Sequence, residues 1–153
     1  YVQLINVMFE KLTYSGTECN NYLCFAFNAL EFDVKAISES IGIEATSIMI
    51  KKDPVPKSTM WEYRINAGND IDLESHIEKL IDLFEPKIDK INDIKEKLGL
   101  TTRLQFVIDI DINPESSTPY FGLNSRTINF LNRTGTDVDF DLYKADTIGL
   151  LDK

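Results

Sequence analysis

The chain has few of the residues from which most catalytic and metal-binding motifs are built. Its 153 residues include two cysteines, one histidine and seven glycines. A single histidine does not make a multi-histidine metal site, and the sequence contains no CxxC pair, glycine-rich phosphate loop or GxSxG elbow. We therefore expect a protein that is not an enzyme and that holds no metal and no cofactor.

The two cysteines, Cys19 and Cys24, are too few and too poorly spaced for a disulfide framework. If Asn21–Phe27 is a strand, the extended chain between them holds their Cα atoms well beyond the roughly 7 Å limit for a bridge. We expect reduced thiols, which are typical of the cytoplasm. Cys24 lies in an apolar segment and is expected to be buried and inert, whereas Cys19 lies in a polar segment and is expected to be exposed.

Long hydrophobic runs are also missing. Runs such as Ile148–Leu151 are far too short to span a bilayer. The segment Tyr1–Phe9 is apolar, but no basic region precedes it and no small-residue cleavage site follows it, so it does not resemble a signal peptide. These features predict a cytoplasmic protein that does not enter the membrane.

Positive charge is scarce as well, since 16 Lys and Arg residues stand against 25 Asp and Glu residues and give a net charge of −9. A protein that binds nucleic acid through its phosphates needs the opposite sign, and an anionic membrane surface is disfavoured for the same reason. Two explanations remain open: the charge serves solubility, or it is directed at a basic partner.

Hydrophobic periodicity predicts alternating strands and helices over most of the chain. The predicted elements are strand Asn21–Phe27, a helix from Val34 to Ile41, strands Thr46–Ile50 and Trp61–Ala67, a helix from Asp72 to Leu98, strand Arg103–Ile112, a helix from Asn124 or Ser125 to about Asn132, and strand Asp137–Tyr143. Asp33 and Gly42 are expected to cap the first helix, and Pro86 is expected to kink or break the long one.

This order, β-α-β-β-α-β followed by a helix and a strand, matches the split βαβ pattern of ferredoxin-like folds with an added C-terminal unit. We expect a single α+β domain over residues 1–153, built as a two-layer sandwich whose mainly antiparallel sheet is covered on one face by helices. In the last helix, Ile128 and Leu131 are expected to face inward.

Alternating aspartates are the most distinctive local feature. Asp109 and Asp111 lie two residues apart on one predicted strand, and Asp137, Asp139 and Asp141 do the same on the last one, so each set shares a face. If the two strands are neighbours, the five carboxylates form one negative surface. Such a surface could be the ordinary solvated face of a sheet, a binding surface for a Lys- and Arg-rich partner, or a divalent-cation site.

Two further residues have ordinary structural interpretations. His76 lies in the long predicted helix without a nucleophile or orienting carboxylate in a recognisable motif, so a surface or boundary position is expected. Trp61 follows a proline-containing loop, and a core position is favoured over a platform for a ligand.

Several segments resemble one bacterial family. The runs FDVKAISESIGIEATSIMIKKDP, DLESHIEKLIDLFEPKIDKINDIKEKLG and GLNSRTINFLNRTGTDVDFDLY are similar to the domain of unknown function 4279 family over about residues 21–143. The features that carry the resemblance are Gly42–Ile43, Thr46, Asp53–Pro54, Trp61, Asp72–His76 and Asp137–Tyr143. The resemblance implies no assigned activity and no catalytic residues. It does imply a size and charge similar to those of small bacterial immunity proteins, which neutralise toxin domains.

The resemblance and the charge together favour a non-enzymatic binding protein of the immunity type. Such a protein would neutralise a toxin domain, for example a basic nuclease, by direct binding through Asp109, Asp111, Asp137, Asp139 and Asp141. A scaffolding or housekeeping domain that self-associates is the alternative. A third hypothesis is a small-molecule binder or enzyme with a pocket lined by Trp61 and neighbouring loops.

Overall fold

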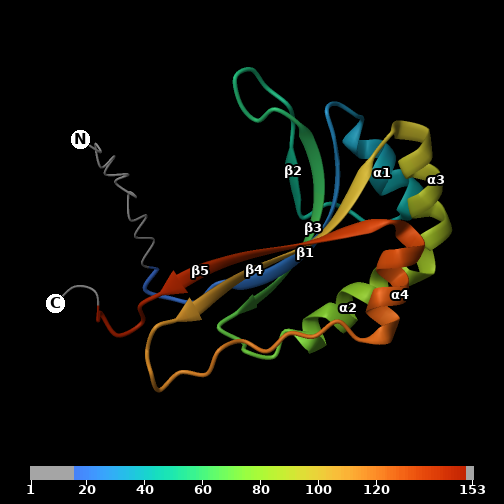
Figure 1. Ribbon diagram of the computed structural model, residues 1–153. Helices are drawn as coiled ribbons and strands as arrows, with labels where there is room; N and C mark the ends of the chain where they lie inside the picture. The colour runs from blue at the N-terminus through green and yellow to red at the C-terminus, as the bar shows by residue number, and fades with distance from the viewer. Residues whose placement is uncertain (1–15, 151–153) are drawn as a thin grey trace, which may run out of the picture.

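Five strands form one sheet in the order β2-β3-β1-β4-β5 in a computed structural model that describes residues 16–150 (Figure 1). The strands are β1 (Asn21–Ala29), β2 (Ser47–Met49), β3 (Thr59–Gly68), β4 (Thr101–Asp111) and β5 (Thr136–Ala145). All five predicted strands are confirmed, with ends that differ by a few residues. The apolar segment Tyr1–Phe9, for which no signal-peptide role is expected, lies outside the described residues.

The pairing makes the sheet mostly antiparallel. Strand β1 pairs antiparallel with both β3 and β4, and β2 pairs antiparallel with β3. Strand β5 is the exception, because it runs parallel to β4 from the pair Thr102–Thr136 to the pair Asp111–Ala145. A parallel neighbour needs a crossover connection, and α4 (Ser125–Thr134) lies in the connection between these two strands.

The helices begin and end where the sequence predicts. In α1 (Val34–Ile41), the Asp33 side chain accepts a hydrogen bond from the backbone N–H of Lys35, and Gly42 ends the helix at a φ of 70°. The long helical segment is divided at Pro86 into α2 (Glu74–Phe84), a 3-10 turn (Glu85–Lys87) and α3 (Ile88–Leu98). Between residues 16 and 150, no helix is long and apolar enough to cross a membrane.

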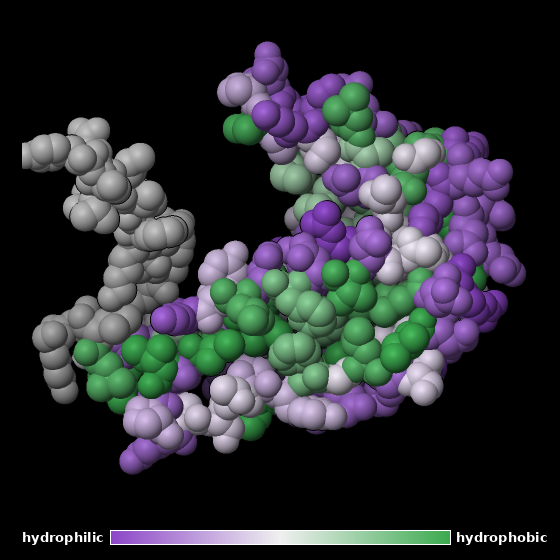
Figure 2. All heavy atoms as spheres, viewed as in Figure 1, coloured by the Kyte–Doolittle hydropathy of each residue, from purple (hydrophilic) through white to green (hydrophobic). Residues whose placement is uncertain are grey.

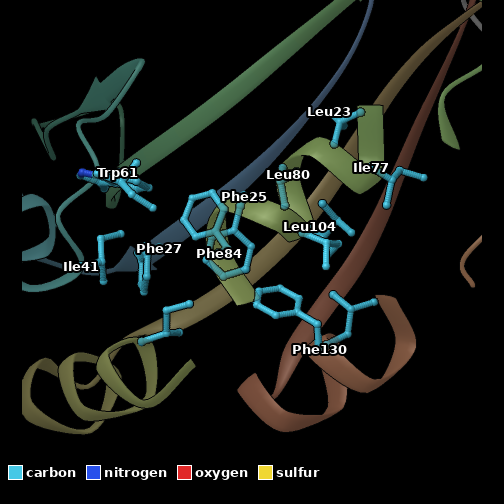
Figure 3. Close-up of a cluster of buried hydrophobic side chains, with 14 of the residues drawn as sticks. Leu23, Phe25, Phe27, Ile41, Trp61, Ile77, Leu80, Phe84, Leu104 and Phe130 are labelled. Atoms are coloured by element: carbon cyan, nitrogen blue, oxygen red, sulfur yellow. The ribbon is translucent and has the colours of Figure 1, made fainter. Parts of the chain in front are cut away.

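The helices pack on one face of the sheet and enclose an aromatic core with it (Figures 1 and 3). Phe25 on β1 lies at the centre of this core, in ring contact with Phe27, Phe84 and Phe130. The core position predicted for Trp61 is confirmed: its side chain is buried, and its indole Nε1 donates to Ser38 Oγ on α1 at 3.0 Å.

The outer strand β5 is only partly covered by helices. Helix α4 buries a single stripe of Thr127, Phe130, Leu131 and Thr134. The inward position is confirmed for Leu131 but wrong for Ile128, which is 54% exposed because it lies beside this stripe. On β5, Phe140 and Leu142 also remain 42% and 55% exposed, since no described helix extends over that end of the strand. The α+β class is therefore confirmed, with an apolar edge left partly uncovered.

Candidate functional site

The five predicted aspartates lie on one face of two neighbouring strands. The register between β4 and β5 pairs Arg103 with Asp137 and Asp109 with Tyr143, and residues paired across strands point to the same face. The aspartates therefore share the face opposite the one that carries Leu104 and Phe106 into the core. The prediction of one aspartate surface required that these two strands be neighbours, and this condition is confirmed.

Two of the five aspartates hold the chain together at the end of β4. Asp109 Oδ2 accepts the backbone N–H of Asn20 at 2.7 Å, which fixes the segment before β1. Asp111 accepts hydrogen bonds from Thr147 Oγ1 at 2.6 Å and from Ser116 Oγ at 2.9 Å. The hydrogen bonds from Thr147 and from the backbone N–H of Asn113 lower the pKa of Asp111 to about 2. These carboxylates are largely occupied within the protein.

The other three aspartates run along β5, where Asp139 and Asp141 are half-buried. Asp137 is exposed at the start of the strand. Asp139 forms an exposed ion pair with Arg103 on β4, at 3.3 Å between Oδ2 and the guanidinium. Asp141 accepts a hydrogen bond of 2.7 Å from Gln105 Nε2. We call Asp137, Asp139 and Asp141 the β5 aspartates, and they form the best candidate surface for a charged partner.

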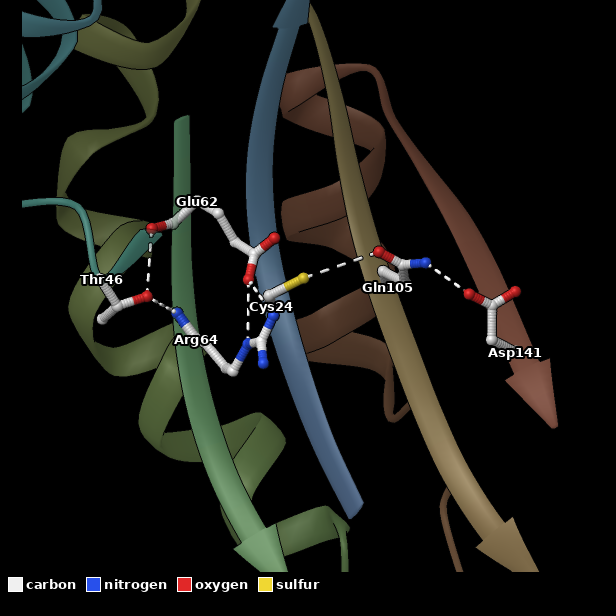
Figure 4. A network of polar contacts seen from close by, with 6 residues as sticks. All are labelled: Cys24, Thr46, Glu62, Arg64, Gln105 and Asp141. Carbon is white, nitrogen blue, oxygen red and sulfur yellow. Dashed lines mark hydrogen bonds and ion pairs between the residues drawn. The ribbon is translucent and has the colours of Figure 1, made fainter. Parts of the chain in front are cut away.

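A series of polar contacts orders this face from one side of the sheet to the other (Figure 4). At one end, the backbone N–H of Arg64 donates to Thr46 Oγ1 at 2.7 Å, and its guanidinium pairs with the buried Glu62 at 2.8 Å. Further along, Cys24 Sγ contacts Gln105 Oε1 at 3.8 Å, and Asp141 lies at the other end of the series. Because the Gln105 amide is held from both sides, its N–H group points to Asp141.

Cys24 lies in the middle of this series as a neutral thiol. Burial on the central strand raises its pKa to about 12, and the nearby Glu62 contributes in the same direction. The prediction of a buried thiol is confirmed. However, Cys24 is on the polar face of the sheet, where longer side chains cover it, and not among the aromatic residues of the core. Neither cysteine forms a disulfide.

Sequence reasoning did not identify the partners of the aspartates. Strand periodicity could predict which face these partners share, because each of them alternates with largely apolar residues along its strand: Glu62, Arg64, Arg103 and Gln105. Which of them would meet which carboxylate depends on the strand order β3-β1-β4-β5, which connects segments far apart in the sequence.

His76 occupies the boundary position expected for it. Its Nε2 lies 3.0 Å from Asp70 Oδ2, and its Nδ1 is buried without a hydrogen-bond partner among the described residues. The backbone N–H of Asp72 and the His76 ring together lower the pKa of Asp70. The ring therefore holds the start of α2 against the turn after β3.

A cavity of about 590 Å³ lies where β4 ends and β1 begins. Cys19, Asp111, Ser116 and Thr147 are among the residues that line it. Partial burial and the charges of Asp111 and Asp109 raise the pKa of the Cys19 thiol, which lowers its thiolate fraction. Trp61 is fully buried and is not among the residues that line this cavity.

No group of three or more His, Cys, Asp or Glu side chains is placed to hold a metal ion in the part of the chain that the structure describes. The sequence model of one family, the domain of unknown function DUF4279, matches residues 17–145. No curated protein and no solved structure matches the chain.

Proposed function

The chain belongs to the DUF4279 family, and we propose that it is a non-enzymatic protein that binds a basic protein partner, as an immunity protein binds a toxin domain. One observation carries this proposal: the β5 aspartates alternate along an edge strand, on the face that the helices leave open. The net charge of −9 adds a long-range attraction toward a partner of opposite sign.

The β5 aspartates suit this role because two of them are ordered before any partner arrives. Gln105 fixes the Asp141 carboxylate, and Arg103 positions that of Asp139. Side chains that are already ordered lose less conformational entropy on binding. An exposed pair such as Arg103–Asp139 contributes little by itself, so an incoming lysine or arginine can share the carboxylate at small cost.

The immunity hypothesis is tested by co-expression. The terminal portion of the protein encoded by the gene immediately upstream is produced in bacteria, with and without this protein, and growth is followed. Relief of a growth arrest supports the hypothesis. Arrest that persists in the presence of the protein, or the absence of any arrest, counts against it.

A pair of matched variants tests the surface once a partner is known. Asp137, Asp139 and Asp141 are changed together to Asn, and Asp53, Asp89 and Asp93, which are exposed elsewhere, form a control with the same change in net charge. We expect the first variant to slow association by about tenfold at low salt and to flatten its salt dependence. Equal effects of the two variants would indicate that only net charge matters.

We also infer a ferredoxin-like unit within the fold. The strand order β2-β3-β1-β4, with antiparallel neighbours and helices after β1 and β3, supports it, and β5 would be an addition to this unit. Superposition of an experimental structure on ferredoxin-like domains tests the inference. We expect the first four strands to superpose in order and direction, and a mismatch in either would reject it.

Self-association is the second candidate function, and exposed apolar side chains favour it. Figure 2 shows hydrophobic side chains gathered in the region of β5. The exposed apolar side chains include Phe140 and Leu142 on β5 and Ile128 on the neighbouring helix α4. Contiguous exposed apolar surface is typical of contact sites. Light scattering over a range of concentrations tests it, since a constant monomer mass would reject self-association and a rising mass would support it.

A further inference from the structure

One edge of the sheet offers an unpaired strand. Strand β5 pairs with β4 along its whole length. On its other side, among the described residues, the bridge from Gly16 to Ala145 is the only pairing, and it lies at the very end of the strand. The backbone groups of residues 136–144 that point away from β4 therefore have no strand beside them within residues 16–150. A row of free N–H and C=O groups is a template for another strand.

The side chains of β5 divide into two chemically different rows. The β5 aspartates form one row on the open face of the sheet, and Val138, Phe140 and Leu142 form the other on the opposite face. Phe140 is held in place by stacking on Phe106, with ring centroids 4.9 Å apart and planes at 14°. A strand added at this edge would place its own side chains alternately beside the same two rows.

We propose that β5 binds its partner by strand addition, and that the partner supplies an extended segment in which lysine or arginine alternates with apolar residues. The basic side chains lie beside the β5 aspartates, and the apolar ones lie beside Phe140 and Leu142. This inference rests on the proposed function, because it specifies how the basic partner is recognised. Backbone hydrogen bonds supply the attachment, and the two rows supply the selectivity.

The same charges disfavour a second copy of β5 as the occupant. When two β5 strands pair edge to edge about a two-fold axis, the aspartates of both copies lie on the same face of the joined sheet. Like charges beside one another on paired strands are destabilising. The alternating aspartates therefore favour a strand of opposite charge over a second copy of β5.

A synthetic peptide provides the probe. It has about nine residues that alternate lysine with valine, enough to span residues 136–144, and carries a fluorophore for anisotropy measurements. Two control peptides accompany it. One has the same composition with its lysines and valines in separate blocks, and the other is N-methylated at alternate residues so that one of its edges cannot donate hydrogen bonds. The full chain is used throughout.

We expect the alternating peptide to bind the native protein at least about tenfold more tightly than either control peptide. When Asp137, Asp139 and Asp141 are changed to Asn, the three peptides should bind with similar affinity. Circular dichroism of that variant checks that it is folded. Equal binding of all three peptides would overturn strand addition, yet it would leave the proposed attraction of basic partners intact. Failure of every basic peptide to bind would count against the proposed function itself.

Hydrogen exchange of the full chain identifies the occupant. Amides of β5 that exchange quickly in the free protein and slowly with the alternating peptide would support the proposal. Outward-facing amides that are already slow in the free protein would overturn it, because the edge would then be occupied by another segment of the chain or by a second copy. A dependence of that protection on protein concentration would identify the second copy.

Discussion

The two edges of the sheet are protected in different ways. At one edge, β2 (Ser47–Met49) has only three residues, and the loop that follows contains Pro54 and Pro56. At the other edge, β5 has ten residues, no proline and an aspartate at alternate positions near its middle. The short β2 offers few backbone groups to an incoming strand, whereas β5 is long enough to pair along most of its length and carries a row of like charges.

This difference matters because shortness and charge exclude different partners. A three-residue strand offers few backbone hydrogen bonds to any incoming strand, whatever the sequence of that strand. A charged edge rejects strands of like charge, accepts strands of opposite charge, and changes its selectivity with salt. The contrast predicts that binding and stability effects will concentrate at the β5 edge, and four experiments test or sharpen it.

The largest effect is expected beneath β5. Phe106 is fully buried between the core and the rings of Phe121 and Phe140, so Phe106→Ala should lower the free energy of unfolding by about 3–5 kcal/mol. The corresponding change at the β2 edge, Ile48→Ala, removes a side chain that is 51% exposed and should cost within about 0.5 kcal/mol. Urea unfolding measures both. Similar losses for the two variants would show that the edges are equally well packed.

The second effect concerns the attachment of β5 to the helices. Lys95 Nζ on α3 donates to Thr102 Oγ1 at 2.9 Å and to the carbonyl oxygens of Thr134 and Gly135, at the end of α4 just before β5 begins. Burial lowers the pKa of this lysine. Lys95→Met removes these three hydrogen bonds and should cost about 1–3 kcal/mol.

The exposed Lys97 on the same helix gives the matched control, because Lys97→Met removes the same charge without those hydrogen bonds. Thermal and urea unfolding of both variants would separate the two contributions. If Lys97→Met destabilised the protein as much as Lys95→Met, the charge and not the hydrogen bonds would explain the loss.

A third, smaller effect depends on pH. Asp111 accepts hydrogen bonds from the segment after β5, and its pKa in the folded protein is about 2, below the value of 3.8 for an ordinary Asp. A carboxylate with a lowered folded pKa stabilises the protein above its unfolded pKa, and this contribution is lost as the pH falls. The Tm difference between the native protein and Asp111→Asn should therefore be complete above about pH 4 and vanish toward about pH 2.

Asp53, exposed in the loop after β2, provides the control at the other edge. Asp53→Asn removes a carboxylate that makes no comparable set of hydrogen bonds, and it should leave Tm nearly unchanged across the same range. A Tm difference for Asp111→Asn that stayed constant from neutral pH to pH 2 would contradict the assignment.

The smallest expected effect is on association without a partner. Changing Asp137, Asp139 and Asp141 to Asn removes the like-charge repulsion that keeps two β5 edges apart, with little change in folding stability. We expect the weight-average mass to rise with concentration in light scattering for this variant. The variant with Asn at positions 53, 89 and 93 should remain closer to the native protein. A monomeric mass for both would mean that charge is not what protects this edge.

The sequence predicted local features well. Strand alternation placed the aspartates of each strand on one face of that strand, and Asp33, Gly42 and Pro86 marked the boundaries of helices, because each of these signals acts within a few residues. The five aspartates were predicted to form one surface if their two strands were neighbours, and the structure makes β4 and β5 neighbours.

Long-range features could not be predicted in the same way. The division of the five into Asp109 and Asp111, which hold loops, and the β5 aspartates, which hold none, depends on contacts with Asn20 and Thr147 from distant segments. The exposure of Ile128 was also missed, because helical spacing predicts a stripe but not the width of the sheet beneath it.

The position of Cys24 has a practical consequence. Its thiol is fully buried on the central strand and remains protonated at neutral pH, so an alkylating reagent reaches a reactive thiolate only when the sheet opens. In a Cys19→Ser background, the rate of alkylation under native conditions would measure how often that opening occurs. Alkylation of Cys24, followed by mass spectrometry, would therefore report the rate at which the sheet opens, and the measurement requires no binding partner.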